Sequence, residues 1–189
     1  MRFSADRLAA LARRAREGRV VAFDTETTGC AWYDEICQIA AAEYVGGRLA
    51  RTFAAYVCPT CRMSWGAYRV HGLSMEFLRE NGDEPGEAMR RFFDFVGEDV
   101  LLVAHNSPFD VRMVRRECEK FGIDAAPRGV EICDSLSLSR RLLPGISHAL
   151  GALVDYLGID ASNSHDALDD AKACAGVFFK LLEYGVSAG

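Results

Sequence analysis

Acidic residues and one histidine are concentrated in three short strings of the sequence. The strings are Phe23-Asp24-Thr25-Glu26-Thr27-Thr28-Gly29, His105-Asn106-Ser107-Pro108-Phe109-Asp110 and His165-Asp166-Ala167-Leu168-Asp169-Asp170. Each string lies where a strand or a loop is expected to pass into a helix. Carboxylates gathered at such junctions repel one another unless positive charge lies between them, and carboxylate oxygens are the ligands that hard divalent cations prefer. The three strings therefore indicate a divalent cation site.

The first string can hold a cation by its own geometry. Residues two apart on an extended strand point to the same side, so Asp24 and Glu26 face one space together. A surface strand with two alternating acids is the simpler interpretation of such a pair. The preceding run of residues 20–23 is apolar, however, and predicts a buried strand, where unpaired carboxylates are costly. The turn after Glu26, at residues 27–29, offers backbone N–H groups that could meet a phosphate or a ribose.

The third string contains three aspartates, and helical periodicity separates them. At about 100° per residue, Asp170 lies roughly 60° from the centre of an apolar stripe and faces the fold. Asp166 and Asp169 are interpreted as helix N-terminal charges that face solvent. His165 precedes the helix, and because histidine as a residue type can take up and release a proton near neutral pH, it suits a general base, although a lone histidine is more often a cap or a surface residue.

Apolar runs and turn residues predict the strands and helices that must position these strings. The patterns predict three antiparallel strands, at residues 19–24, 36–45 and 49–57, with a Gly-Gly hairpin turn at residues 46–47. Residues 100–104 form a continuous apolar run, typical of a strand buried on both faces. This run leads directly to Pro108, which suits a first helical turn and places Asp110 in that turn.

The remaining segments complete an α/β fold. Residues 131–134 predict a last short strand, and residues 58–72 predict an irregular loop that carries Trp65 and Tyr68 near the site. Strands in a meander followed by strands alternating with helices predict a mixed sheet, an antiparallel meander plus parallel strands, with helices on both faces. The 189 residues are expected to form one domain, residues 1–189. The predicted helices cover residues 74–80, 87–96, 135–142 and 148–157 and a terminal helix from Ser164 or His165.

Composition limits the classes of function. The net charge is −5, from 22 basic and 27 acidic residues, which argues against binding over a long stretch of nucleic acid. No apolar run is long enough to span a membrane, and we expect no membrane partner. Seven cysteines form an odd set that lies mostly in apolar runs, which is typical of reduced thiols and predicts a cytoplasmic protein. Cys58 and Cys61, with His71, leave open an incomplete zinc site, and two incidental thiols in a loop are the simpler interpretation.

Taken together, the three strings resemble the motifs of the DEDDh family of 3′→5′ exonucleases. This family has a ribonuclease H-like fold and includes the proofreading subunits of bacterial replicative DNA polymerases and ribonuclease T. The resemblance covers nearly the whole chain. It extends to Glu35-Ile36-Cys37-Gln38-Ile39-Ala40, Val70-His71-Gly72-Leu73 and Asp134-Ser135-Leu136.

The resemblance implies a reaction and a set of roles. It makes two Mg²⁺ or Mn²⁺ ions the cofactors and His165 the general base, with the spacing from His165 to Asp170 matching the histidine branch of the family. The reaction is hydrolysis of phosphodiester bonds at the 3′ end of single-stranded DNA or RNA by a two-metal mechanism, which releases nucleoside 5′-monophosphates. The implied metal ligands are Asp24, Glu26, Asp110 and Asp170.

The resemblance also implies which residues hold the terminal nucleotide. For Leu73 and Phe109, ordinary core packing is at least as good an interpretation. Cys30, after Gly29, departs from the larger apolar residue that relatives often carry, which affects the expected contact with the terminal base and not the chemistry. The implied substrate contacts are Thr25, Thr28, His71, Leu73, Asn106 and Phe109.

Other functions remain open at this point. One is an exoribonuclease of the same family that acts on RNA, since discrimination by the 2′-hydroxyl rests on contacts that the sequence does not place. Another is a non-catalytic metal-binding accessory subunit of a polymerase or repair complex, although all four acids and the histidine are present. Because only residues 183–189 follow Leu182, the sequence favours a stand-alone exonuclease over a polymerase-bound one.

Overall fold

The computed structural model describes residues 5–124, 129–161 and 165–187. Within these residues, five strands form one sheet in the order β3-β2-β1-β4-β5. β1 pairs antiparallel with β2, and β2 with β3, whereas β1 with β4 and β4 with β5 are parallel. The predicted mixed α/β sheet is confirmed. The strands are β1 (Arg19–Thr27), β2 (Ile36–Val45), β3 (Arg48–Tyr56), β4 (Val100–Ala104) and β5 (Glu131–Asp134).

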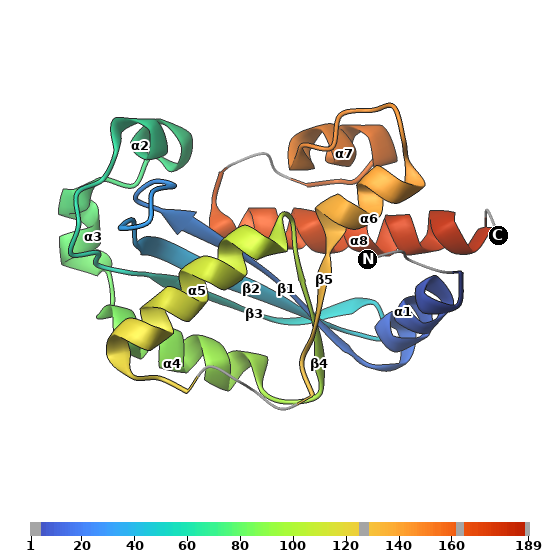
Figure 1. The fold of residues 1–189 in the computed structure, drawn as a ribbon, viewed down its shortest axis with the longest axis horizontal. Helices are drawn as coiled ribbons and strands as arrows, with labels where there is room; N and C mark the ends of the chain where they lie inside the picture. The colour runs from blue at the N-terminus through green and yellow to red at the C-terminus, as the bar shows by residue number, and fades with distance from the viewer. Residues whose placement is uncertain (1–4, 125–128, 162–164, 188–189) are drawn as a thin grey trace.

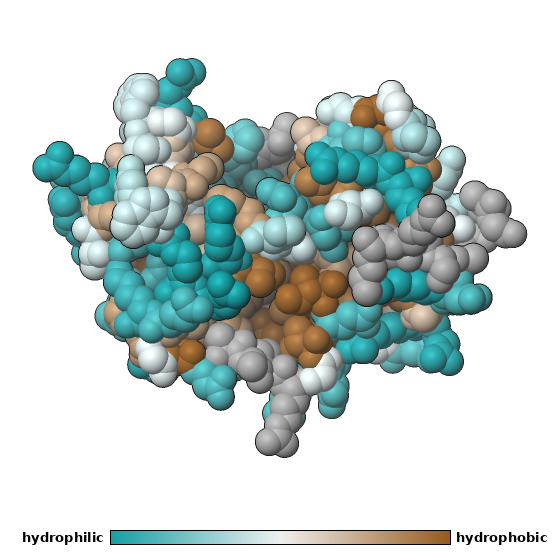
Figure 2. Space-filling model, viewed as in Figure 1, coloured by the Kyte–Doolittle hydropathy of each residue, from teal (hydrophilic) through white to brown (hydrophobic). Residues whose placement is uncertain are grey.

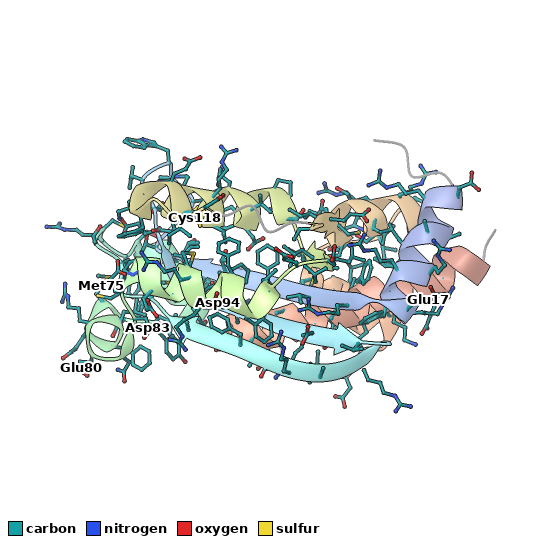
Figure 3. All side chains as sticks on the ribbon, turned by 90° about the horizontal axis from the view of Figure 1, so that it is seen from below. Glu17, Met75, Glu80, Asp83, Asp94 and Cys118 are labelled. Carbon is teal, nitrogen blue, oxygen red and sulfur yellow. The ribbon has the colours of Figure 1, made fainter. Side chains whose placement is uncertain are left out.

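Helices cover both faces of this sheet (Figure 1). One hydrophobic core lies between the sheet and α4 and α5, and the other between the sheet and α1, α6, α7 and α8. Figure 3 shows the side chains of α4 and α5, marked by Asp94 and Cys118, filling the space against the strands. The helices are α1 (Ala5–Glu17), α2 (Trp65–His71), α3 (Met75–Asn81), α4 (Pro85–Val96), α5 (Ser107–Phe121), α6 (Ser135–Leu142), α7 (Leu150–Leu157) and α8 (Ala167–Ser187).

The central strand β1 explains why the two cores exist. Its side chains alternate between the faces, so Val20 and Ala22 enter the core beneath α8 whereas Val21 and Phe23 enter the core beneath α4. All four are almost completely buried. The first polar residue after this run, Asp24, therefore lies at the end of a strand that is held rigidly from both sides.

The structure corrects the prediction for residues 58–72. Residues 65–71 form helix α2 instead of an irregular loop. Its ends have strong local signals: the Ser64 hydroxyl accepts the backbone N–H of Ala67, and Gly72 ends the helix in the left-handed conformation with φ 72°. None of the residues of α2 is buried, so the apolar periodicity that usually reveals a helix is missing here.

The remaining boundaries agree with the sequence patterns to within a few residues. β1 continues three residues beyond its predicted end, to Thr27, and α8 begins at Ala167, just after His165. Ser164, the other predicted start of this helix, lies outside the described residues. Among the described residues, no helix combines the length and the apolar character that crossing a membrane requires.

Candidate metal centre

Three carboxylates from two elements converge at the end of β1. Asp24 and Glu26 lie on the strand, two residues apart and on the same side, and Asp170 lies in the first turn of α8. One carboxylate oxygen from each of the three lies within 4.8 Å of the others. In the described part of the chain, this is the one group of three or more candidate ligand side chains with such spacing.

Gln38 of β2 positions the helix that carries Asp170. The side-chain amide Nε2 of Gln38 donates to Oδ2 of Asp166 at 2.8 Å, and its Oε1 accepts the backbone N–H of Ala167 at 3.2 Å. Gln38 is paired in register with Glu26 across the sheet and is only 2% exposed. A single buried amide therefore ties the first turn of α8 to the strand next to the acids.

Asp110 reaches the same region from the parallel side of the sheet. β4 runs beside β1 and ends at Ala104, so α5 begins near Asp24 and carries Asp110 in its first turn. The hydroxyl of Thr25 donates to Oδ1 of Asp110 at 2.7 Å. Asp110 is only 3% exposed and lies outside the group of three described above.

The start of α5 is fixed by a carboxylate from β5. Oδ1 of Asp134 accepts the backbone N–H groups of Asn106 and Ser107, at 3.0 and 3.1 Å. Its Oδ2 accepts the backbone N–H and the hydroxyl of Ser137, in the first turn of α6. One side chain thus caps two helices, which lets Asn106 adopt the left-handed conformation, with φ 75°, where the chain turns from β4 into α5.

His165 lies at the open side of the centre. It is exposed, and its backbone has a φ of 48°, which places it in the left-handed region immediately before α8. Its positive charge, when present, lowers the pKa of Asp170. The imidazole therefore lies close enough to influence the carboxylates without being buried among them.

Burial is the main reason why the pKa of each acid of the centre is raised. Burial raises the pKa of Glu26 to about 8, with a further contribution from the charge of Asp170. Burial also raises the pKa of Asp110 to about 7, although the hydrogen bond from Thr25 opposes this. The pKa of Asp24 lies well above its ordinary value, first because of burial and then because of the neighbouring charge of Asp110. The pKa of Asp170 is raised by burial as well.

This cluster fits a divalent cation. Within the described residues, no lysine or arginine forms an ion pair with any of the four acids. Carboxylates that are this close and this buried are unfavourable as anions unless positive charge compensates them. Oxygen ligands without sulfur or a second histidine favour Mg²⁺ or Mn²⁺ over softer metals.

Three of the predicted substrate contacts have partners inside the protein. The hydroxyl of Thr25 is committed to Asp110, and that of Thr28 donates to Oδ1 of Asp34 at 2.9 Å. Nδ1 of His71 accepts the backbone N–H of Leu73 at 3.0 Å, so its Nε2 carries the proton and faces the carbonyl of Thr27 at 3.3 Å. Each of these side chains therefore has a hydrogen-bond partner within the protein.

The other predicted contacts lie at the surface or at its edge. Asn106 is exposed, and Leu73 is half-buried. Phe109 is also half-buried: it packs against the core under α5, and the guanidinium of Arg112 lies 5.3 Å from its ring centroid. Both interpretations made for Phe109, core packing and substrate contact, are therefore compatible with its place.

Two thiols named in the sequence stand apart from the acids. Neither Cys58 nor Cys61 belongs to the ligand group found among the described residues. The sulfur of Cys61 lies 3.1 Å from the hydroxyl of Thr28, which gives this thiol a local hydrogen-bond partner.

Sequence reasoning missed Gln38 and misplaced Asp166. Asp166 does not simply face solvent, because it is half-buried and accepts from Gln38. A signal for this was present: Gln38 is the one polar residue in the apolar run 36–42, and a buried amide must find hydrogen-bond partners.

Comparison with known proteins gives a consistent result. The model of the RNase T family, described as exonuclease, matches residues 21–178. The DNA polymerase III subunit epsilon of Pasteurella multocida is 34% identical over 175 residues, covering 86% of this chain and 68% of that protein. A PolC-type DNA polymerase III of Caldanaerobacter subterraneus subsp. tengcongensis is 32% identical over 171 residues, covering 88% of this chain.

A solved structure shares the fold. Escherichia coli exonuclease I, in complex with a dT13 oligonucleotide, superposes with a TM-score of 0.77 at 22% identity and covers 87% of this chain. The chain spans 41% of that exonuclease and 12% of the PolC-type polymerase.

Proposed function

Because this chain belongs to the RNase T exonuclease family, we propose that it is a metal-dependent 3′→5′ exonuclease. It hydrolyses phosphodiester bonds at the 3′ end of single-stranded nucleic acid and releases nucleoside 5′-monophosphates. The observation that carries this proposal is the convergence of Asp24, Glu26 and Asp170 within 4.8 Å without a lysine or arginine partner among the described residues.

The proposed ligands of two divalent cations, Mg²⁺ or Mn²⁺, are the four acids of the centre. When bound, such cations neutralise the charge of a phosphodiester and lower the pKa of water. The carboxylates of Asp24 and Glu26 have a fixed spacing because β1 is buried on both faces. Asp110 is oriented by the hydroxyl of Thr25, and Asp170 by the attachment of α8 to Gln38.

His165 is the proposed general base. A base for water must exchange its proton with solvent between turnovers, and the exposed imidazole can do so. Its place immediately before α8 lets the ring approach the acids from outside. In each turnover a ring nitrogen of His165 takes a proton from the attacking water, and the water oxygen bonds to phosphorus. The bond from phosphorus to the 3′ oxygen of the preceding nucleotide breaks, this oxygen takes up a proton from solvent to become the new 3′-hydroxyl, and His165 returns its proton to solvent.

The substrate is proposed to be single-stranded DNA, with RNA as the second candidate. Two similar proteins are named as DNA polymerase III components, which supports DNA and, further, a polymerase as a partner. The remaining alternative is an accessory subunit that binds metal and does not cleave.

The test is hydrolysis of 5′-labelled oligonucleotides of DNA and RNA, single-stranded and duplex, with and without Mn²⁺. We expect stepwise shortening from the 3′ end that requires the metal and is fastest on single strands. His165→Ala should lower kcat by about a hundredfold or more. Glu43→Gln serves as a control, because Glu43 is a buried carboxylate on β2 that is paired with arginines.

The outcomes separate the alternatives. Faster digestion of RNA than of DNA would select the exoribonuclease. Binding of Mn²⁺ without cleavage of any substrate would select the accessory subunit. Cleavage that persists in a chelator would contradict the proposal altogether.

A further inference from the structure

The loop of residues 28–35, between β1 and β2, has an inverted distribution of side chains. Its acids are buried, with Asp34 only 6% and Glu35 only 9% exposed. Its large aromatic residues are exposed, Trp32 at 82% and Tyr33 at 58%. A folded chain normally buries tryptophan and exposes carboxylates, so this loop needs an explanation.

The buried acids are held by specific hydrogen bonds. Oδ2 of Asp34 accepts the backbone N–H of Ala31 at 2.6 Å, and Oδ1 accepts the hydroxyl of Thr28. Glu35 accepts the backbone N–H of Thr60 at 2.5 Å and that of Cys61 at 3.2 Å, and it forms an ion pair with Lys120 at 2.5 Å. The conformation that turns the charges inward is therefore fixed, and it presents Trp32 and Tyr33 to solvent.

Helix α2 adds two more exposed aromatic residues beside this loop. Trp65 is 71% and Tyr68 is 37% exposed, and their ring centroids lie 5.5 Å apart. The backbone N–H of Ser64, just before the helix, donates to the carbonyl of Thr28 at 2.8 Å. Figure 2 shows side chains of intermediate hydropathy over α2, in pale tones.

Both ends of α2 are tied to the residues that follow Glu26. Ser64 binds the carbonyl of Thr28, and Nε2 of His71 faces the carbonyl of Thr27 at 3.3 Å. The exposed rings are therefore fixed next to the metal centre and cannot be regarded as an independent surface. This places α2 beside the strand that carries Asp24 and Glu26, within reach of a nucleic acid whose 3′ end is bound there.

The charge of this surface suits a polyanion. Arg62 and Arg69 flank the aromatic residues of α2, are exposed, and form no ion pair with another described residue. The nearest acids in the loop, Asp34 and Glu35, are turned inward. The surface thus combines aromatic rings with uncompensated positive charge, as sites for single-stranded nucleic acid do.

We propose that Trp32, Tyr33, Trp65 and Tyr68 form an aromatic platform that binds, by stacking, the bases upstream of the 3′-terminal nucleotide. This inference rests on the proposed function. Stacking requires bases that are not already stacked in a duplex, so the platform selects a single strand. It also offers a way for an acidic protein to bind its substrate without a long basic groove.

Tryptophan fluorescence tests the platform directly, because the only two tryptophans of the sequence are Trp32 and Trp65. The Asp24→Asn variant is used so that the oligonucleotide stays intact. Titration with dT12 should quench the fluorescence to saturation, whereas dT2, which is too short to reach the platform, should not. A parallel titration with rU12 shows whether ribose changes the affinity. In the same background, Trp32→Ala and Trp65→Ala should each weaken binding of dT12 by about tenfold.

A kinetic experiment on the active enzyme provides the second readout. The platform variants should raise KM for dT12 by about tenfold with little change in kcat, and should leave hydrolysis of dT2 unaffected. Tyr184→Ala is the matched control: Tyr184 is 48% exposed but lies near the end of α8, about 21 Å along the helix from Asp170. This variant should behave as the unsubstituted protein.

The outcomes distinguish failure of the platform from failure of the proposed function. If the active protein degrades single strands but dT12 neither quenches the fluorescence nor binds more weakly to the tryptophan variants, the platform is wrong and the exonuclease stands. If dT12 quenches the fluorescence, the tryptophan variants weaken binding, and no substrate is cleaved, the platform stands and the exonuclease is wrong. Trp32→Phe and Trp65→Phe, which keep a stacking ring, should recover most of the affinity.

Discussion

Two groups of buried carboxylates in this protein have opposite electrostatic surroundings. Glu43 lies between Arg19 and Arg51, with one oxygen 2.6 Å from the first guanidinium, and Glu35 is paired with Lys120. Burial alone would raise the pKa of Glu43, but the hydrogen bonds from the arginines outweigh it and lower the pKa. The same holds for Glu35 with Lys120.

In the part of the chain that the structure describes, no lysine or arginine pairs with the acids at the end of β1. Burial and mutual repulsion raise the pKa of Glu26 to about 8, and the pKa of Asp24 also lies far above its ordinary value. Glu43 and Glu35 thus have cationic partners, whereas Asp24 and Glu26 have none among the described residues. A cluster of buried acids without cationic partners is therefore an indication of a functional site.

The largest expected effect is the loss of hydrolysis when an acid of the uncompensated group is replaced. Asp24→Asn should lower hydrolysis by on the order of a thousandfold or more, beyond the roughly ten- to hundredfold that groups orienting a ligand contribute. Because the change removes a repelled charge, the unfolding midpoint without metal should stay equal or rise. Steady-state hydrolysis of dT12 and thermal unfolding measure the two quantities.

The same variant should lose the stabilisation that Mn²⁺ gives the unsubstituted protein. A ligand at a hundred times its Kd stabilises a folded protein by about 2.7 kcal/mol. An Asp24→Asn protein that keeps both this stabilisation and its activity would remove Asp24 from the metal centre.

The matching substitution in the compensated group, Glu43→Gln, should lower stability and leave hydrolysis nearly unchanged. Glu43→Gln leaves Arg19 and Arg51 without their carboxylate, and we expect the free energy of unfolding to fall by about 1–2 kcal/mol, since both arginines are partly solvated. Hydrolysis should stay within about twofold, because the charge balance of the metal centre is untouched. Urea unfolding measures the first effect, and a large loss of activity in a folded Glu43→Gln protein would contradict the separation of the two groups.

The two groups of carboxylates should also differ in how they make the stability of the unsubstituted protein depend on pH. For Glu26 and Asp110 the folded pKa values, about 8 and about 7, exceed the unfolded values near 4, so the metal-free protein should lose stability as the pH rises from about 4 to about 8. For Glu35 and Glu43, whose folded pKa values are lowered, stability should instead fall on acidification below about 4.5.

Divalent metal should change only the first of these trends. Because a bound cation favours the ionised acids, saturating Mn²⁺ should flatten or reverse the fall of stability toward pH 8 and leave the acidic side unchanged. Thermal unfolding across this pH range, with and without Mn²⁺, measures both. An equal slope with and without Mn²⁺ would show that the acids bind no metal.

The smallest expected effect concerns Lys120. Lys120→Met converts Glu35 into an uncompensated acid, but the lysine is 40% exposed, so the loss should be no more than about 1 kcal/mol. This corresponds to a fall of about 2–4 °C in Tm for a protein of this size. Lys180→Met, in an exposed pair with Glu183 on α8, is the control and should change Tm less than Lys120→Met does.

The sequence predicted the sheet because apolar runs are long and unambiguous there. The run before Asp24 and the run at residues 100–104 are both buried strands, and the sequence placed Asp110 correctly in the first turn of the helix that follows the second run. The period of the strand placed Asp24 and Glu26 on one side, and that of the helix turned Asp170 toward the fold, because both periods are fixed by the backbone. That the three acids share one site was implied by the resemblance to the exonuclease family, and their convergence agrees with it.

What the sequence did not reveal depends on contacts between distant segments. The role of Gln38 requires α8 to pass beside β2, 128 positions away, and no local pattern gives that proximity. Helix α2 was missed because it buries no residue, and its hydrogen bonds to Thr27 and Thr28 come from the tertiary fold. The exposure of Trp32 likewise follows from partners that hold Asp34 and Glu35 inward.

The attachment of α8 to Gln38 has a dynamic consequence. First turns of helices ordinarily fray, because their amide protons lack acceptors and exchange with water within short times. Here Oε1 of Gln38 accepts the backbone N–H of Ala167, and Oδ1 of Asp166 accepts the backbone N–H of Leu168 at 2.9 Å. Deuterium uptake at these two amides should therefore be slow for a helix terminus. Since the turn bearing Asp170 is already ordered, the proposed binding of a cation to this carboxylate would cost the chain little conformational entropy.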